Sequence, residues 1–191
     1  MATTHYLISK VVVGSGGASS ITFSNIPQTY TDLKIVLSAR SDSASITNAH
    51  LQPNGSTSSL SGKQVYGDGS TAYSGNDGGY GSKAALPGTS QTTNTFGNAE
   101  WYIPNYTGST NKSFSCDTVS ENNGTTAYAN LWAALWSNTS AITSITLDII
   151  ETGNFVQYST ASLYGVSTTG DGTKVPYASG GDVIATDGTY W

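Results

Sequence analysis

The stretch DLKIVLSAR, residues 32–40, decides how this chain folds. Two sets of side chains alternate along it: Leu33, Ile35, Leu37 and Ala39 are apolar, and Lys34, Ser38 and Arg40 are polar. A period of two places the sets on opposite faces of a β-strand, so the stretch predicts a half-buried strand. The stretch ITSITLDII (142–150) repeats the pattern, with Ile145, Leu147 and Ile149 on one face and Thr146 and Asp148 on the other.

Further strands are predicted on both sides of these two, at residues 6–13, 19–23, 45–52, 99–106, 112–120, 127–136 and 159–166. The glycines of GSGG (14–17) predict a hairpin that joins 6–13 to 19–23, and 45–52 is the expected antiparallel partner of 32–40. The segment 127–136 also fits a helix, because Leu131/Leu135 and Trp132/Trp136 are four apart. Its strand-like neighbours favour a strand.

About eight strands with turn residues between them predict an all-β fold, an antiparallel β-sandwich that is jelly-roll-like. A chain of 191 residues suits one domain. We expect the sandwich in residues 1–167 and an extended tail or linker in 168–191. Residues 53–98, rich in Gly, Ser, Thr and Asn, predict one long loop-rich insertion, with short strands around Lys63–Tyr66. This insertion is either a surface excursion packed by its own tyrosines or an arm that contacts a neighbouring subunit or a ligand.

The charge and the apolar pattern of the chain argue against a nucleic acid and a membrane as partners. Only 10% of the residues are charged and the net charge is -5, so no basic surface is available for a nucleic acid backbone. No apolar run approaches the roughly 20 residues of a membrane span.

Cys116 is the only cysteine, which excludes an intrachain disulfide and a cysteine-based zinc cluster. It alternates with Phe114 and Thr118, which predicts a buried small apolar side chain.

No motif in the sequence predicts catalysis. His5 and His50 are the only histidines, and no serine lies in a G-x-S-x-G turn. The carboxylates available for a glycosidase pair are Glu100, Asp117, Glu121, Asp148 and Glu151, and their spacing does not predict a pair. The Asp-Gly turns lack the dense carboxylates of a calcium loop, and TTGDGT (168–173) lacks the Lys-Ser/Thr of a phosphate loop. We therefore expect no enzyme, no cofactor and no metal site.

Aromatic side chains are the remaining candidates for a functional site. Tryptophan and tyrosine rings can stack on sugars, and the candidates are Trp101, Tyr102, Tyr106, Trp132 and Trp136. The alternative interpretation is that most of them belong to the core or to a subunit interface, and this interpretation is favoured.

Three stretches together resemble a family of tailed-bacteriophage virion proteins. They are SSITFSNIPQTYTDLKIVLSARSD (19–42), HLQPNG (50–55) and WSNTSAITSITLDIIETGNFVQYSTASLYGVS (136–167). The resemblance covers most of residues 6–167 but not the region 53–98. It implies a structural protein on the virion surface, more on the capsid exterior than on the tail. Its partners would be the major capsid protein or other virion proteins, and the expected homo-oligomer is a trimer.

The resemblance leaves two functions open. A capsid decoration (cement) protein would reinforce the shell by protein–protein contacts, whereas a tail-fibre or receptor-binding component would contact host glycans. The end of the chain, GGDVIATDGTYW, is expected either to lead into a following domain or to form an arm on a neighbour. In the second case Tyr190 and Trp191 would be buried in that contact.

Overall fold

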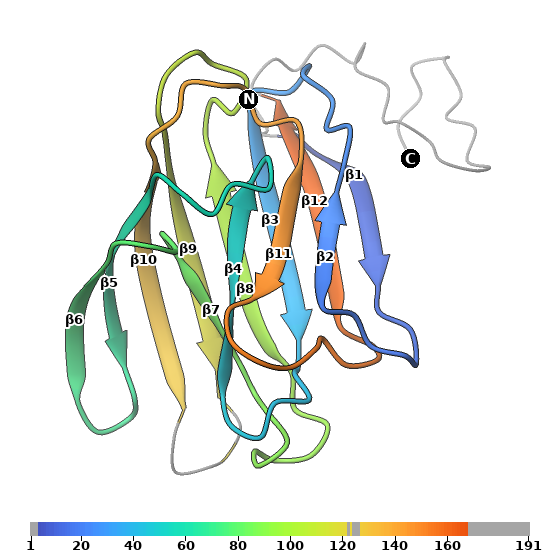
Figure 1. The fold of residues 1–191 in the computed structure, drawn as a ribbon, viewed down its shortest axis with the longest axis vertical. Helices are drawn as coiled ribbons and strands as arrows, with labels where there is room; N and C mark the ends of the chain where they lie inside the picture. The colour runs from blue at the N-terminus through green and yellow to red at the C-terminus, as the bar shows by residue number, and fades with distance from the viewer. Residues whose placement is uncertain (1–3, 122, 124–126, 168–191) are drawn as a thin grey trace.

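The computed structural model describes residues 4–121, 123 and 127–167, and in this part of the chain it is all-β. No described residue lies in a helix, and the strands form two antiparallel sheets that face each other (Figure 1). The predicted all-β sandwich is confirmed. The predicted tail or linker, 168–191, lies outside the described residues.

The larger sheet has eight strands in the order β1-β12-β3-β8-β9-β10-β5-β6. Their bounds are β1 (Thr4–Val12), β12 (Thr160–Ser167), β3 (Asp32–Ala39), β8 (Gly97–Ile103), β9 (Lys112–Ser120), β10 (Tyr128–Trp136), β5 (Leu60–Gly67) and β6 (Ala72–Asp77). The smaller sheet has the order β2-β11-β4-β7, with β2 (Ser20–Phe23), β11 (Ile145–Ile149), β4 (Thr47–Pro53) and β7 (Lys83–Leu86). In Figure 1 the smaller sheet lies in front, and β5 and β6 extend beyond it on the left.

The core fills the space between the two sheets, as the alternation predicts. Leu33, Ile35 and Leu37 of β3 are fully buried, and so are Ile145 and Leu147 of β11. The segment 127–136 is a strand, because Trp132, Ala134 and Trp136 are buried on one face while Leu131 is 53% exposed on the other. Cys116 is buried as predicted, and this burial raises the pKa of its thiol well above the usual value.

The two predicted strand pairings are wrong. β1 pairs with β12 and β2 pairs with β11, so the GSGG turn joins strands of different sheets. Likewise β4 pairs with β11 and β7 and not with β3. The physical reason is that consecutive strands β1 to β4 alternate between the sheets, as in a jelly roll. Alternation of side chains shows which face of a strand is buried and carries no information about its partner.

The prediction of one long loop-rich region at 53–98 is also wrong. It contains β5, β6, β7 and the start of β8, which brings the strands of the described chain to twelve where about eight were predicted. Only the short strand expected around Lys63–Tyr66 is confirmed, inside β5. The edge strand β6 is mostly exposed, so its side chains do not alternate in polarity. Its pairing with β5 is fixed by a turn in which Asp68 Oδ1 accepts hydrogen bonds from the amides of Ser70 (2.9 Å) and Thr71 (2.8 Å).

The stretches that carry the resemblance to virion proteins contact one another in the fold. Gly165 lies against the ring of Tyr30, and a Cβ atom at this glycine would be 2.3 Å from the ring carbons. Asn54 has a φ of 51° and binds the segment 141–144, because its Oδ1 accepts hydrogen bonds from the amides of Thr143 (2.8 Å) and Ser144 (3.1 Å). Residues 136–167 therefore contact both of the other stretches.

Arg40, at the end of β3, anchors the segment between β7 and β8. Predicted on the polar face, it is nevertheless 9% exposed, and its guanidinium donates to four main-chain carbonyls. The distances are 2.6 Å to Gly88, 2.8 Å to Thr92, 3.0 Å to Thr95 and 3.1 Å to Gln91. A planar group with five donors suits such a set of carbonyls, so one arginine orders a segment that has no strand of its own.

Candidate functional site

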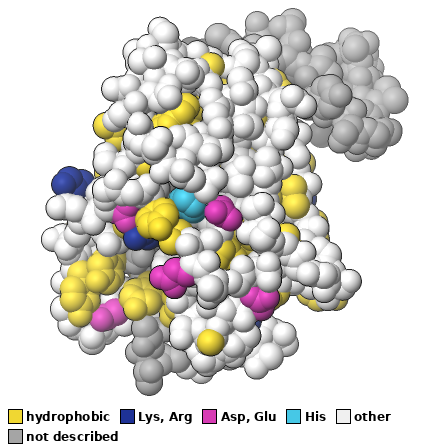
Figure 2. All heavy atoms as spheres, viewed as in Figure 1, with side chains coloured by type: hydrophobic (Ala, Val, Ile, Leu, Met, Phe, Trp, Pro, Cys, Tyr) yellow, Lys and Arg dark blue, Asp and Glu magenta, His cyan; other side chains and the backbone are white. Residues whose placement is uncertain are grey.

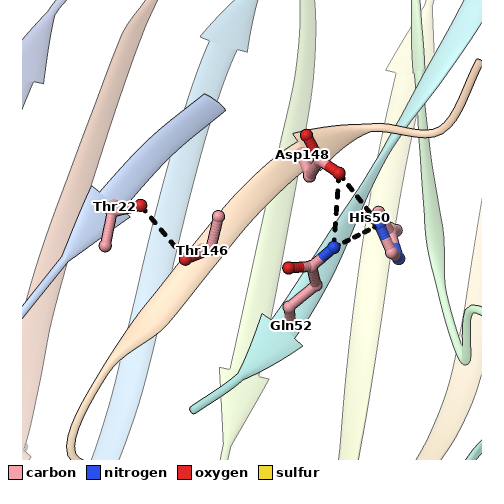
Figure 3. A network of polar contacts seen from close by, with 5 residues as sticks. All are labelled: Thr22, His50, Gln52, Thr146 and Asp148. Carbon is pink, nitrogen blue, oxygen red and sulfur yellow. Dashed lines mark hydrogen bonds and ion pairs between the residues drawn. The ribbon is translucent and has the colours of Figure 1, made fainter. Parts of the chain in front are cut away.

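A polar network covers the outer face of the four-stranded sheet (Figure 3). Thr22 and Thr146 share a hydrogen bond of 3.0 Å between β2 and β11. Gln52 of β4 donates to Asp148 Oδ2 at 3.3 Å, and its Nε2 lies 2.9 Å from His50 Nε2. Since an amide nitrogen donates, the histidine nitrogen accepts, which places the ring proton on Nδ1. The network ties the three neighbouring strands together across their exposed side.

His50 is neutral in this network. The residue is 3% exposed, and burial lowers the pKa of its imidazole against the opposing effect of Asp148, whose Oδ2 lies 3.8 Å away. Its other neighbour is Tyr80, whose ring meets the imidazole edge to face at 4.9 Å. No serine or cysteine is hydrogen-bonded to this histidine among the described residues, so the arrangement does not provide an activated nucleophile.

An ion pair continues this network toward the edge of the sheet. Lys83 Nζ lies 2.5 Å from Asp77 Oδ2 and 4.9 Å from the centre of the Tyr80 ring. Although burial raises it, the pKa of Asp77 is lowered on balance, because Lys83 and the amides of Tyr80 and Gly79 bind the carboxylate. Figure 2 shows acidic and basic side chains gathered beside a histidine on this face of the molecule. The charge of Lys83 is therefore compensated by its partner.

A pocket of about 280 Å³ lies where the eight-stranded sheet extends beyond β7, the edge of the smaller sheet. The larger sheet supplies one wall, from Gln64 and Tyr66 on β5 and from Tyr128, Asn130 and Trp132 on β10. Tyr66 faces Asn130 and Gln64 faces Trp132 in the pairing of these two strands. The smaller sheet supplies the opposite wall, which includes Asn48, Lys83 and Ala85.

Two tyrosines line one side of this pocket, and a third stacks on one of them. The rings of Tyr66 and Tyr73 stack with centres 4.8 Å apart and an angle of 15° between their planes. The ring of Tyr128 meets Tyr66 at 6.1 Å and 60°. Tyr66 and Tyr128 both line the pocket and are half-buried, so their rings form an aromatic corner next to the amide side chains.

Two polar atoms of the pocket wall have no hydrogen-bonding partner among the described residues. They are Oδ1 of Asn130 and Nε1 of Trp132, an acceptor and a donor that are two residues apart on the inner face of β10. A buried polar atom without a partner destabilises a protein by roughly 1–3 kcal/mol. Both atoms are buried within the protein, so a ligand in the pocket does not reach them directly.

A second concave surface lies on the outer face of the eight-stranded sheet. Leu131 of β10 and Val65 of β5 are directly paired across the strands, and they are 53% and 55% exposed. Both line a shallow groove of about 510 Å³, together with Ala133 and Tyr102. These two side chains form an exposed apolar patch on this face of the sheet.

Four of the predicted contact residues lie in the core. Trp101 and Tyr106 are fully buried, while Trp132 and Trp136 are 2% and 1% exposed. Trp101 Nε1 donates to Ser82 Oγ at 2.9 Å. These side chains have no surface to offer to a sugar, which agrees with the core interpretation. Only Trp132 lines a pocket, from within its wall.

Tyr102 is the one predicted contact residue that is half-exposed. Its hydroxyl donates to Asp32 at 2.5 Å, and this hydrogen bond raises the pKa of Tyr102 to about 12. Asp32, the first residue of β3, also accepts from the Asn105 amide at 2.9 Å and is 8% exposed, so this carboxylate is buried. The predicted contacts Tyr190 and Trp191 lie outside the described residues.

Apart from Trp132, the residues of the pocket are not among the predicted contact residues, because they come from distant parts of the sequence. Gln64 and Tyr66 alternate along β5, and Tyr128, Asn130 and Trp132 alternate along β10. This repeated alternation of amide and aromatic side chains is the signal that could have found the site. The pairing of β5 with β10, which brings the two sets together, is not readable from either segment.

The acidic side chains of the described residues do not gather into a metal site. Among the described residues, no group of three or more His, Cys, Asp and Glu side chains could hold a metal ion. Glu100 and Asp117 are neighbours across β8 and β9, side by side on an open sheet face, where Glu100 forms an ion pair of 2.8 Å with Lys34. No helix able to cross a membrane occurs in residues 4–121, 123 and 127–167.

Comparison with protein-family models, with curated proteins and with solved structures finds no match for this chain. The fold and the two concave surfaces are therefore the basis for a function.

Proposed function

We propose that this chain is a structural protein of a bacteriophage virion, and more specifically a capsid decoration protein on the outside of the shell. It acts by protein–protein contact and not by catalysis. Its partner is the major capsid protein or another virion protein. The proposal starts from the resemblance of residues 19–42, 50–55 and 136–167 to virion proteins.

The observation that carries the proposal is the apolar pair of Leu131 and Val65 on the outer face of the eight-stranded sheet. These side chains occupy the middle of a groove and are flanked by small residues such as Ala133 and Ser115. An exposed apolar pair on a sheet face suits a contact with another protein, and the charges of Asp117, paired with Leu131, and of Lys63 border it. We therefore assign this face to the attachment of the protein.

A homo-oligomer is part of the proposal, with a trimer as the expected form. The larger sheet ends in two edge strands, β1 and β6. β1 is irregular between Leu7 and Ser9, which interrupts its ladder with β12 and weakens this edge as a template for pairing. β6 is mostly exposed, and contact between subunits is one way to cover it.

The second candidate is a tail-fibre or receptor-binding component that contacts host glycans. The pocket between β5, β10 and β7 favours it, because aromatic rings and amide side chains are arranged there around a small cavity. The two roles require different surfaces of the same sheet: the outer face for attachment and the inner face for a ligand.

The attachment face is tested by binding of the purified protein to virions that lack it. We expect the substitution Leu131→Asp to weaken binding about tenfold or more, because it places a charge in a desolvated contact. Leu7→Asp is the matched control, since Leu7 is 46% exposed but lies on β1 at the opposite edge of the sheet. Cosedimentation of the protein with the particles measures the affinity. Equal binding of both variants, or no binding of the unaltered protein, contradicts the proposal.

A further inference from the structure

We propose that the pocket between β5, β10 and β7 binds a neutral saccharide. The inference concerns the inner face of the eight-stranded sheet and does not rest on the decoration role, which uses the outer face. It rests on the second candidate role, contact with a glycan, and names the class of sugar that the pocket would take.

The dimensions of the pocket suit one or two sugar rings. Its volume of about 280 Å³ lies just below the range of roughly 300–1,000 Å³ that is typical of small-molecule sites. It is open along the edge β7, because the smaller sheet ends there while the larger sheet continues through β10, β5 and β6. A sugar at the end of a longer chain can therefore enter from the side.

The tyrosines provide a stacking surface for a sugar ring. A pyranose has an apolar face of C–H groups, and aromatic rings pack against such faces while their hydroxyls stay in contact with water. Tyr66 and Tyr128 meet at an angle of 60°, so a ring that lies against one of them touches the edge of the other. Tyr73 stacks on Tyr66 at 4.8 Å and holds its plane. This corner exists without any rearrangement of the backbone.

The polar groups match the hydroxyls of a sugar. Asn48, Gln64 and Asn130 line the pocket, and each amide offers both donors and an acceptor. A sugar hydroxyl donates and accepts at once, so it can pair with these amide side chains in either direction.

The charge of the pocket decides between neutral and acidic sugars. Lys83 is the only cation among the lining residues, and its ammonium is paired with Asp77 at 2.5 Å. An acidic sugar would have to break this pair or leave its carboxylate without a partner in a chain whose net charge is -5. The pocket therefore favours a saccharide without charge.

Saturation-transfer difference NMR with irradiation of aromatic protons tests the site directly. The probes are the methyl glycosides of glucose, galactose, mannose and N-acetylglucosamine, with N-acetylneuraminic acid as the acidic comparison. We expect at least one neutral glycoside to receive saturation in the millimolar range. Titration with the matching disaccharide and tetrasaccharide then distinguishes a free sugar from a glycan chain, because additional rings tighten binding only for the chain.

The substitution Tyr66→Ala is expected to weaken the binding at least tenfold, while Tyr66→Phe keeps the stacking surface and retains most of it. Tyr128→Ala provides a second test at the beginning of β10, in case Tyr66→Ala perturbs the fold. The matched control is Tyr164→Ala, which removes a half-exposed tyrosine from β12, well away from the pocket strands in the sheet order.

Loss of binding in the Tyr66→Ala or Tyr128→Ala variant, with binding kept in Tyr164→Ala, supports the site. Three results would overturn the proposal: no saturation of any neutral glycoside, binding of the acidic sugar alone, or equal binding by the pocket variants and the control. The NMR measurement on the unaltered protein decides the first two without any variant.

Discussion

Replacement of Arg40 by alanine removes the group that holds the segment 88–95, and we expect a large loss of stability from this one change. The bond to the Gly88 carbonyl, at 2.6 Å, is buried, and a hydrogen bond to a charged donor contributes roughly 1.5–3 kcal/mol. The carbonyls of Gln91, Thr92 and Thr95 lie in a more exposed segment. They can turn to water, so each loses only about 0.5 kcal/mol. The expected loss for Arg40→Ala is therefore about 3–4.5 kcal/mol.

Arg40→Lys separates the charge from the geometry of the guanidinium. An ammonium at this position cannot reach four carbonyls in one plane, so we expect about half of the loss to remain. The control is Lys34→Ala on the same strand. It breaks only the surface ion pair with Glu100, and such pairs contribute about 0–1 kcal/mol.

The assay for both variants is urea unfolding, combined with hydrogen exchange of residues 88–96. The amides of Thr89 and Ser90 donate to Ser43 and Ala44, so their exchange reports whether this segment still lies against the sandwich. We expect faster exchange there in Arg40→Ala. If Arg40→Ala loses no more stability than Lys34→Ala, the account of Arg40 as an anchor is refuted.

Three further substitutions test other parts of the account. Gly165→Ala should destabilise the fold by roughly 1–3 kcal/mol, because the methyl group of the alanine overlaps the Tyr30 ring. Urea unfolding measures the loss in the native chain and in a Tyr30→Ala background. An equal loss in both would contradict the overlap with Tyr30 as the cause. Asn54→Ala should lower the free energy of unfolding by about 2 kcal/mol, because alanine disfavours the positive φ of 51° and loses the hydrogen bonds to 141–144. Asn54→Gly should lower it less, because glycine keeps this φ and loses only the hydrogen bonds. If Asn54→Gly is as stable as the native chain, these hydrogen bonds contribute nothing. The pKa of His50 in the folded chain is lowered from 6.5, so the unfolded chain binds the proton more readily than the folded chain. The stability is therefore full above pH 6.5 and falls as the pH drops toward the lower pKa of the folded chain. His50→Gln should flatten this dependence in urea titrations at pH 5 and 7, and an unchanged slope would refute the assignment.

The sequence predicts the strands whose two faces have different surroundings. β3, β10 and β11 alternate because one face lies in the core and the other on the surface. The pairing of strands was not predictable, since a buried face looks the same whichever strand lies beside it. For this reason GSGG was interpreted as a hairpin turn, although it joins the two sheets.

β5, β6 and β7 were hidden by their composition. β6 is an edge strand with Gly75 in its middle, and little of it is buried, so no apolar period identifies it. Its place is set by pairing with β5 and by the turn at Asp68. The pairing with β5 and the hydrogen bonds of the Asp68 turn are contacts between different segments, and the intrinsic strand propensity of residues 72–77 does not include them.

The aromatic residues show where prediction of the site succeeds and fails. The tryptophans at 101, 132 and 136 are buried, as large apolar side chains on alternating strands usually are. The tyrosines that line the pocket are not among the predicted contact residues, because Tyr66 and Tyr128 are brought together only by the pairing of β5 with β10.

The most direct test of the proposed function is the position of this protein in an averaged image of the intact virion. The account predicts density in many copies over the capsid lattice, with the eight-stranded sheet turned toward the shell so that Leu131 and Val65 lie in the contact. Density confined to the tail would contradict the decoration role. A particle without any density for the protein would contradict its assignment to the virion.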